Sequence, residues 1–255
     1  MGEAFLSGLI AAGVAADSLA VAEAHPERRH DLEVLFPGVR VVPSAAWAVA
    51  DAEVIVVAVK PPDVVSVLAS IEEAITASAT VISIAAGIST VAIESATGKR
   101  SVIRVMPNTP AMVGAGVSAI AAGSFATEAD LAEAERLLRA LGTTVRVDED
   151  QIDAVTAISG SGPAYVFLVA EAMIDAGVAE GLDRELAAEL VFQTILGAGQ
   201  MLVQTNQSAK ELRAMVTSPG GTTAAAIAVF QDEGFESLIA DAVHAARVRS
   251  EEMGR

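Results

Sequence analysis

The pattern of apolar and polar positions divides the chain into two parts. In the first part, short apolar runs alternate with stretches of helical spacing. The clearest run, residues 54–59, is unbroken and ends at Lys60-Pro61-Pro62, which suits a strand buried on both faces. Shorter strands are predicted over 18–23, 39–42, 81–85, 102–105 and 145–147, and helices over 3–12, 26–35, 64–75 and from Thr127. Alternating helices and strands predict a parallel sheet with right-handed crossovers.

Strand signals stop after Asp148, and the rest of the chain is predicted to be helical. Ala-rich helices are predicted over 152–178, 184–206, 208–216, 222–232 and 235–252. Four consecutive polar residues, 148–151, mark the change. We therefore predict an α/β fold: a Rossmann-like doubly wound parallel sheet over 1–149, followed by an all-α domain over 150–255.

Composition and charge narrow the classes of partner. The 255 residues suffice for two domains, and with 4% aromatic residues the core must consist of Ala, Val, Ile and Leu. A net charge of -17 without a basic stripe argues against nucleic acid and anionic membranes as partners. The sequence has no Cys, and its three His lack the spacing of metal ligands. No apolar stretch is long enough to predict a membrane span, and the start of the chain does not resemble a secretory leader. We expect a soluble, cytoplasmic protein without a metal site.

The start of the chain resembles the end of a dinucleotide-binding loop. Such a loop has the pattern G-x-G-x-x-G between the first strand and the first helix, and Gly2 occupies its third glycine position. The first strand and the other two glycines are therefore expected to be missing from this sequence. About 20 residues on, Glu23 could bind a ribose hydroxyl of NAD. The extra phosphate of NADP could instead be bound by basic residues that follow Glu23, namely His25, Arg28 and Arg29. For each of these, a solvated start of a helix is the alternative, and the choice between NAD and NADP stays open.

A Ser-Pro-Gly-Gly-Thr-Thr segment, residues 218–223, precedes a predicted helix. Its adjacent glycines allow the backbone to form an amide-lined concavity at the positive end of that helix. Such a concavity suits a small carboxylate, because local dipoles can bind an anion that the acidic protein as a whole repels. The alternative is a plain turn with Thr222 as an N-cap.

Other polar residues carry weaker signals. Lys60 and Arg104 are the basic residues expected to lie nearest a functional site. Each could equally be the partner in a structural ion pair. The acidic run 148–150 is interpreted as a solvated loop rather than an acid–base pair. No Ser/His/Asp arrangement indicates a hydrolase.

Five blocks of sequence stand out together: Ala-Val-Lys-Pro at 58–61, Ser-Ile-Ala-Ala-Gly at 83–87, Arg-Val-Met-Pro-Asn-Thr-Pro at 104–110, Ser-Gly-Ser-Gly-Pro-Ala-Tyr at 159–165, and Thr-Ser-Pro-Gly-Gly-Thr-Thr at 217–223. In order and spacing they resemble the pyrroline-5-carboxylate reductases, over essentially the whole chain. The last block is nearly specific to that family. The block at 159–165 has an alternative, because its small residues would also allow two helices to pack closely.

The resemblance implies a function and an assembly. The family transfers a hydride from NADPH, with NADH as the alternative donor, to 1-pyrroline-5-carboxylate and forms L-proline, the last step of proline biosynthesis. It also implies a helical domain that dimerises by interleaving with its partner, often within a larger homo-oligomer, and a substrate pocket at that interface.

The resemblance also implies site residues. Substrate-binding residues would be Ser218, Gly220, Gly221, Thr222 and Thr223, with the Thr223 hydroxyl in the catalytic role of hydrogen-bonding the ring nitrogen. Cofactor-binding residues would be Gly2, His25, Arg28, Arg29, Ala58, Val59, Lys60, Pro61, Ala86, Gly87, Asn108 and Thr109.

Two other functions stay open. Without its first strand the chain could be a non-catalytic fragment, because two strand edges would lack a partner. Whichever function holds, the missing first strand predicts that strands 18–23 and 54–59 do not pair directly but flank a gap of roughly 9 to 10 Å. The chain could also be a related two-domain NAD(P)-dependent dehydrogenase of another small acid. Such enzymes use a Lys or His proton relay in the helical half, where Lys210 and His244 occur outside any recognisable motif.

Overall fold

The computed structural model of the protein describes residues 1–254, which form two compact units. The sheet unit contains Met1–Ser161 together with the residues from Ala246 onward, and the helical unit is Gly162–Ala245. The sheet unit therefore extends past the predicted boundary at residue 149 and takes in the end of the last helix.

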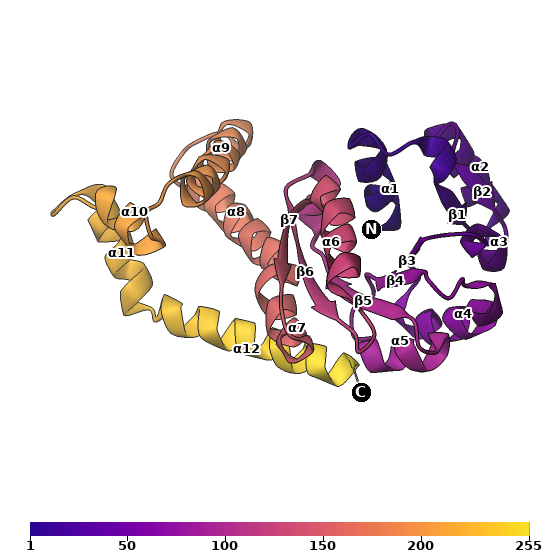
Figure 1. The fold of residues 1–255 in the computed structure, drawn as a ribbon. Helices are drawn as coiled ribbons and strands as arrows, with labels where there is room; N and C mark the ends of the chain where they lie inside the picture. The colour runs from indigo at the N-terminus through magenta and orange to yellow at the C-terminus, as the bar shows by residue number, and fades with distance from the viewer. Residues whose placement is uncertain (255) are drawn as a thin grey trace. The chain divides into compact units, whose positions relative to one another are not determined.

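The strands of the sheet unit form a two-stranded and a five-stranded sheet (Figure 1). In the first, β1 (Ala20–Ala22) pairs in parallel with β2 (Arg40–Val42). The second has the order β3-β4-β5-β6-β7, with bounds Val54–Val57, Thr80–Ser83, Ser101–Met106, Gly116–Ala122 and Gly142–Arg146. β1 and β3 do not pair with each other, as the sequence predicted.

Two strands depart from an all-parallel arrangement. β3, β4 and β5 are parallel, but β6 is antiparallel to β5, and β7 is parallel to β6. β6 was not predicted from the sequence. The short connection of residues 107–115 explains its direction, because a parallel neighbour would need a crossover of about a dozen residues or more.

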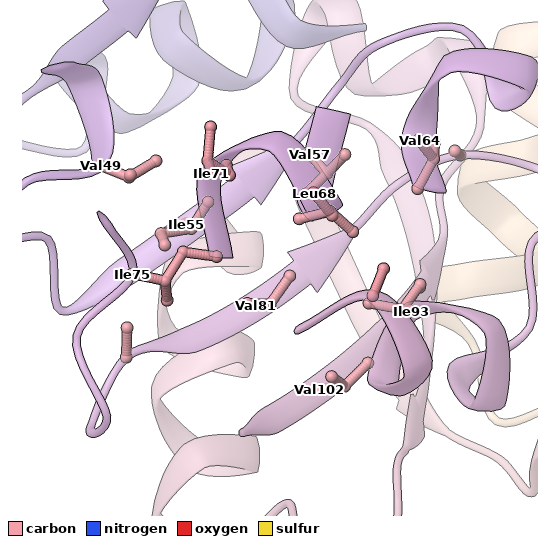
Figure 2. Packing of buried hydrophobic residues seen from close by; sticks show 13 residues of the cluster. Val49, Ile55, Val57, Val64, Leu68, Ile71, Ile75, Val81, Ile93 and Val102 are labelled. Carbon is pink, nitrogen blue, oxygen red and sulfur yellow. The ribbon is translucent and has the colours of Figure 1, made fainter. Parts of the chain in front are cut away.

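Helices cover both faces of the five-stranded sheet. Neighbouring residues on a strand point to opposite faces, so an unbroken run of apolar residues needs cover on both. Val81 and Val102 belong to the core cluster that contains Leu68 and Ile93 (Figure 2). Their neighbours Ile82 and Ile103 belong to a second cluster with residues of α1 and α6. The helices of this unit are α1 (Gly2–Ala11), α2 (Pro26–Leu35), α3 (Ala45–Val49), α4 (Val64–Ile71), α5 (Thr90–Thr97), α6 (Glu128–Leu138) and α7 (Ile152–Val155). The doubly wound, Rossmann-like fold class is confirmed.

Local signals account for where several helices begin. Pro26 opens α2 at its first position, where a missing N–H costs nothing. Thr127 caps α6 as predicted: its Oγ1 accepts the N–H of Asp130 at 3.3 Å, and the Asp130 carboxylate accepts the N–H of Thr127 at 2.8 Å. This reciprocal pair is a capping box.

The helical unit confirms the prediction of helices without strands. It contains α8 (Gly162–Ala179), α9 (Arg184–Gln204), α10 (Ala209–Met215), α11 (Thr222–Asp232) and the first part of α12 (Phe235–Met253). α8 and α9 pack against each other (Figure 1). The helix predicted over 152–178 is divided into α7, a π-helical turn at Thr156–Gly160, and α8.

Candidate active site

The loops that follow β3, β4 and β5 gather most of the predicted cofactor residues. Lys60-Pro61 follows β3, Ala86-Gly87 follows β4, and Asn108-Thr109 follows β5. Because these strands are adjacent and parallel, the three loops leave the sheet at the same edge. In doubly wound sheets this carboxyl edge is where ligands bind.

The start of α1 lies against the loop after β3. A Cβ atom added to Gly2 would be 3.0 Å from the Cβ of Ala58, so a larger residue at position 2 would displace one of the two. No side chain caps the N-terminus of α1. Its first N–H groups are therefore suited to an anion such as a pyrophosphate.

The residues after β1 form a hydrogen-bonded loop. The Glu23 carboxylate accepts the N–H of His25 at 2.9 Å. Arg29 Nη1 donates to the carbonyl oxygens of Glu23 and Ala24 at 2.9 and 2.8 Å, so this guanidinium holds the loop in place. Arg28 instead forms a partly exposed ion pair with Glu3 of α1. The structure thus places Arg28 near the first turn of α1.

Asn108 uses both ends of its amide within the sheet unit. Its Oδ1 accepts the N–H of Val117 at 3.0 Å, and its Nδ2 donates to the carbonyl oxygen of Ser159 at 3.1 Å. Asn108 therefore connects the loop after β5 to β6 and to the π-helical turn. Its neighbour Thr109 starts the following 3-10 turn and is exposed.

Of the two basic residues considered, Arg104 is an ion-pair partner, whereas Lys60 is exposed. Arg104 is 7% exposed, and its Nη1 lies 2.8 Å from Oε1 of Glu149. The same Oε1 accepts the N–H of Thr90, the first residue of α5, at 3.2 Å. The interpretation of residues 148–150 as a solvated loop was therefore wrong for Glu149, because a buried arginine in the central strand requires a counter-charge.

The Ser-Pro-Gly-Gly-Thr-Thr segment lies in the helical unit at the start of α11. Gly220 has φ +70, a conformation that side chains rarely adopt. A Cβ atom at Gly221 would be 2.5 Å from Oγ of Ser218, so a larger residue there would displace the Ser218 hydroxyl. Gly221 is the N-cap, without a side-chain hydrogen bond, and Thr222 is the first helical residue rather than the cap. The N–H groups at this helix end are suited to a carboxylate.

The predicted substrate residues thus form one local arrangement, and the predicted cofactor residues form another. The substrate residues all belong to the helical unit and the cofactor residues all belong to the sheet unit. Thr223 is half-buried in the first turn of α11.

Sequence reasoning missed the contribution of α12 to the sheet unit. The Ala86-Gly87 turn shares a cleft of ≈ 180 Å³ with Ser250 and Met253 from the end of α12. No local pattern marks α12 residues as neighbours of this turn, because the contact joins distant parts of the sequence.

The fold and these loops define the class of protein, an NAD(P)-dependent oxidoreductase. Residues 1–87 match the family model "NADP oxidoreductase coenzyme F420-dependent", and residues 149–253 match "Pyrroline-5-carboxylate reductase dimerisation". The chain is 44% identical to the pyrroline-5-carboxylate reductase of Pseudomonas aeruginosa, covering 99% of this chain and 93% of the relative. A Synechocystis relative of the same name is also 44% identical, covering 100% and 95%. The chain belongs to the pyrroline-5-carboxylate reductase family.

Solved structures agree with this assignment. The structure of a pyrroline-5-carboxylate reductase from Coxiella burnetii matches with a TM-score of 0.95 and 35% identity, covering 100% of this chain and 95% of that one. The Plasmodium falciparum pyrroline carboxylate reductase with NADP bound matches with a TM-score of 0.88 and 32% identity, covering 100% and 95%. Prephenate dehydrogenase from A. aeolicus, at 11% identity and a TM-score of 0.55, shares the fold alone.

Proposed function

We propose that this chain reduces 1-pyrroline-5-carboxylate to L-proline, with NADPH as the hydride donor. One observation carries the proposal: a chain of this family has a glycine-lined helix start at residues 218–223 that suits a small carboxylate. The reaction consumes the imine, one NADPH and one proton, and it yields proline and NADP⁺.

The cofactor supplies the hydride, and the protein supplies position and charge. The N–H groups at the start of α11 hold the substrate carboxylate, and the Thr223 hydroxyl hydrogen-bonds the ring nitrogen as its positive charge falls. The N-terminus of α1 would hold the pyrophosphate, and the Ala86-Gly87 turn would flank the nicotinamide.

The proposal is tested by following the loss of reduced nicotinamide with the purified protein and the imine. We expect turnover by the wild type and a decrease in kcat of roughly 10- to 1000-fold in Thr223→Ala, the range for loss of one polar catalytic contact. Thr143→Ala, an exposed change on β7, is the matched control and should leave kcat unchanged. A folded wild-type protein without turnover would favour the non-catalytic fragment.

The same assay separates the remaining dehydrogenase alternative. Lys210 and His244 are exposed on α10 and α12. Unchanged kcat in Lys210→Ala and in His244→Ala would exclude a proton relay at either residue. A large loss in one of them would instead assign a proton relay to that residue.

We propose that NADPH is preferred over NADH because Arg28 is available to the extra phosphate. Arg29 is engaged with two backbone carbonyls, whereas the partners of Arg28 within residues 1–254 are two carboxylates, Glu3 and Asp31, which a phosphate can displace. In Arg28→Gln we expect KM for NADPH to rise about tenfold while KM for NADH changes little, as for loss of one charged hydrogen bond. Arg136→Gln, which also removes a surface ion pair, is the control.

We further propose that the chain works as a homodimer in the cytoplasm. Within the described residues, Glu149–Ala179 and Arg184–Gln204 are long and apolar enough to span a membrane, and only 11% of each apolar window is buried. Both stretches lie within the match to the dimerisation family model, so a second copy of the chain is our proposed cover for them. Sedimentation of the detergent-free protein tests this, and a monomer or a requirement for detergent would contradict it.

A further inference from the structure

The end of α12 packs, backbone against backbone, on the turn that we assign to the nicotinamide. Gly87 has φ +74, and a Cβ atom there would lie 3.1 Å from the carbonyl oxygen of Met253. A Cβ atom on Gly254 would in turn lie 3.4 Å from the carbonyl oxygen of Gly87. Two glycines therefore face each other where α12 meets the turn. A side chain at Gly87 would be strained by its positive φ and would press on the backbone of the helix end, whereas a Cβ at position 254 would make an ordinary contact.

A partly buried hydrogen bond holds the end of α12 in this place. The Ser250 hydroxyl donates to Oδ1 of Asp153 at 2.6 Å, and Ser250 is 7% exposed. Asp153 follows Ile152, which is fully buried against Ala119 and Ala121 of β6. A short hydrogen bond from a hydroxyl to a carboxylate is among the strong kinds. The last turn of α12 is thereby fixed to the sheet through α7.

The far side of the turn is fixed separately. The N–H of Thr90, three residues after Gly87, donates to Glu149, whose carboxylate is paired with Arg104. Because the Thr90–Glu149 hydrogen bond restrains the turn on that side, further movement of the Ala86-Gly87 turn depends on its contact with the end of α12. Loss of the Ser250–Asp153 hydrogen bond would loosen the contact with α12 and leave the Thr90–Glu149 hydrogen bond in place.

We propose that Ser250 and Asp153 are positioning residues for hydride transfer, because their hydrogen bond holds the end of α12 against the Ala86-Gly87 turn and so sets the place of the nicotinamide ring. This inference rests on the proposed function, which assigns that turn to the nicotinamide. In the proposed function the dinucleotide would be held elsewhere, by the start of α1 at Gly2 and by Arg28. Loosening the turn therefore lowers kcat and leaves the affinity for NADPH nearly unchanged.

The test compares Ser250→Ala with Ser250→Thr, which keeps the hydroxyl. We expect kcat to fall about 10- to 100-fold in Ser250→Ala, since displacement of a reacting group by about 1 Å can cost 100-fold. KM for NADPH should stay within about twofold, and Ser250→Thr should recover most of kcat. The control is Ser66→Ala, which removes an exposed helix hydroxyl bonded to its own backbone and should not change kcat.

A second readout separates this inference from the proposed function. The fluorescence of NADPH bound to the protein alone reports the surroundings of the nicotinamide without turnover. We expect it to change in Ser250→Ala at nearly constant Kd, and to return in Ser250→Thr. A wild type that binds NADPH but does not reduce the imine would contradict the proposed function, and the fluorescence comparison would still decide the role of Ser250.

Three outcomes would overturn the inference. The first is a folded Ser250→Ala protein with wild-type kcat and wild-type NADPH fluorescence. The second is a rise in KM that accounts for the whole loss, which would indicate a role in binding. The third is a wild type that does not bind NADPH at all. If Ser250→Ala does not fold, Asp153→Asn takes its place, because the amide oxygen still accepts the hydroxyl and an intermediate loss of kcat is expected.

Discussion

The sheet unit and the helical unit differ in how far their large apolar side chains are buried. In the sheet unit, Val81, Val102 and Ile103 of the central strands are fully buried, with helices on either face. In the helical unit, Phe167 on α8 and Phe192 on α9 are 65% and 60% exposed. Both units are rich in apolar residues, so composition does not separate them. Their difference shows that the sheet unit folds around its own core, whereas the helical unit has apolar faces suited to a partner.

Because of this contrast, the stability of the two units should depend differently on protein concentration. Burying a side chain of the size of Leu or Phe contributes about 1.5 to 3 kcal/mol, which the helical unit gains only when another surface covers it. The stability of a unit that requires a partner rises with protein concentration, whereas the stability of a self-contained unit does not. Three changes test the contrast, from the largest expected effect to the smallest.

The first change attacks the interior of the sheet unit. Glu149→Ala leaves the buried Arg104 without its counter-charge, and we expect the free energy of unfolding to fall by about 3 to 5 kcal/mol at any protein concentration. Denaturant unfolding measures this loss. The double change Arg104→Met with Glu149→Ala should recover most of it, because no unpaired charge stays buried. A double variant no more stable than the single one would show that the charge is not the cause.

The second change attacks an exposed apolar face of the helical unit. Phe192→Asp should weaken the dimer by about 2 kcal/mol or more, the effect of removing a central aromatic anchor, and so raise the dissociation constant at least roughly 30-fold. Sedimentation at a series of concentrations measures it. Val91→Asp, the same kind of change at an exposed apolar residue of α5 in the sheet unit, is the matched control. Equal effects of the two changes would abolish the contrast.

The third change concerns the capping box of α6 and its dependence on pH. Burial tends to raise the pKa of Asp130, but hydrogen bonds from Thr127 and Thr80 outweigh it and lower this pKa below its usual value. The lowered pKa means that the ionised form stabilises the fold above the unfolded pKa, and this contribution is lost as the pH falls through the folded pKa. Asp130→Asn should cost about 1 kcal/mol at neutral pH, the usual value of a cap.

The pH series provides the control for this prediction. As the pH falls below about 4, the ordinary pKa of an aspartate, and then through the lower pKa of the folded state, the wild type loses the same contribution. The two proteins should therefore become equally stable only below that folded-state pKa. Urea unfolding at several pH values measures the difference. A difference that stays constant down to the acid range would mean that the charge of Asp130 does not contribute.

The fold could be predicted where local signals were strong. Pro26 and the helical spacing after it located α2 with its observed bounds, and the apolar run 54–59 located β3 with an error of two residues at its end. β6 was missed because its small residues, such as Gly116 and Ala119, lack the bulky β-branched pattern of the other strands. Its place in the sheet depends on pairing with β5, which is not a local property.

The candidate site shows the same limit. The Gly220-Gly221 pair could be recognised because two adjacent glycines before a predicted helix form a local pattern. The structure places the pair at the start of α11 as expected, and the positive φ of Gly220 favours glycine there. The participation of Ser250 could not be predicted, because an isolated serine in a helix has no signature until its partner is known.

By itself, the sequence determined the alternation of helices and strands, the two-part organisation, and the motifs that carry the family and its chemistry. These features follow from periodicity, capping and conformations available only to glycine, which act over a few residues. Only the tertiary structure decided that Arg104 pairs with Glu149, that β6 runs against β5, and that α12 ends on the Ala86-Gly87 turn. These contacts join residues far apart along the chain, and they form only when packing brings charge, strand edge and backbone together.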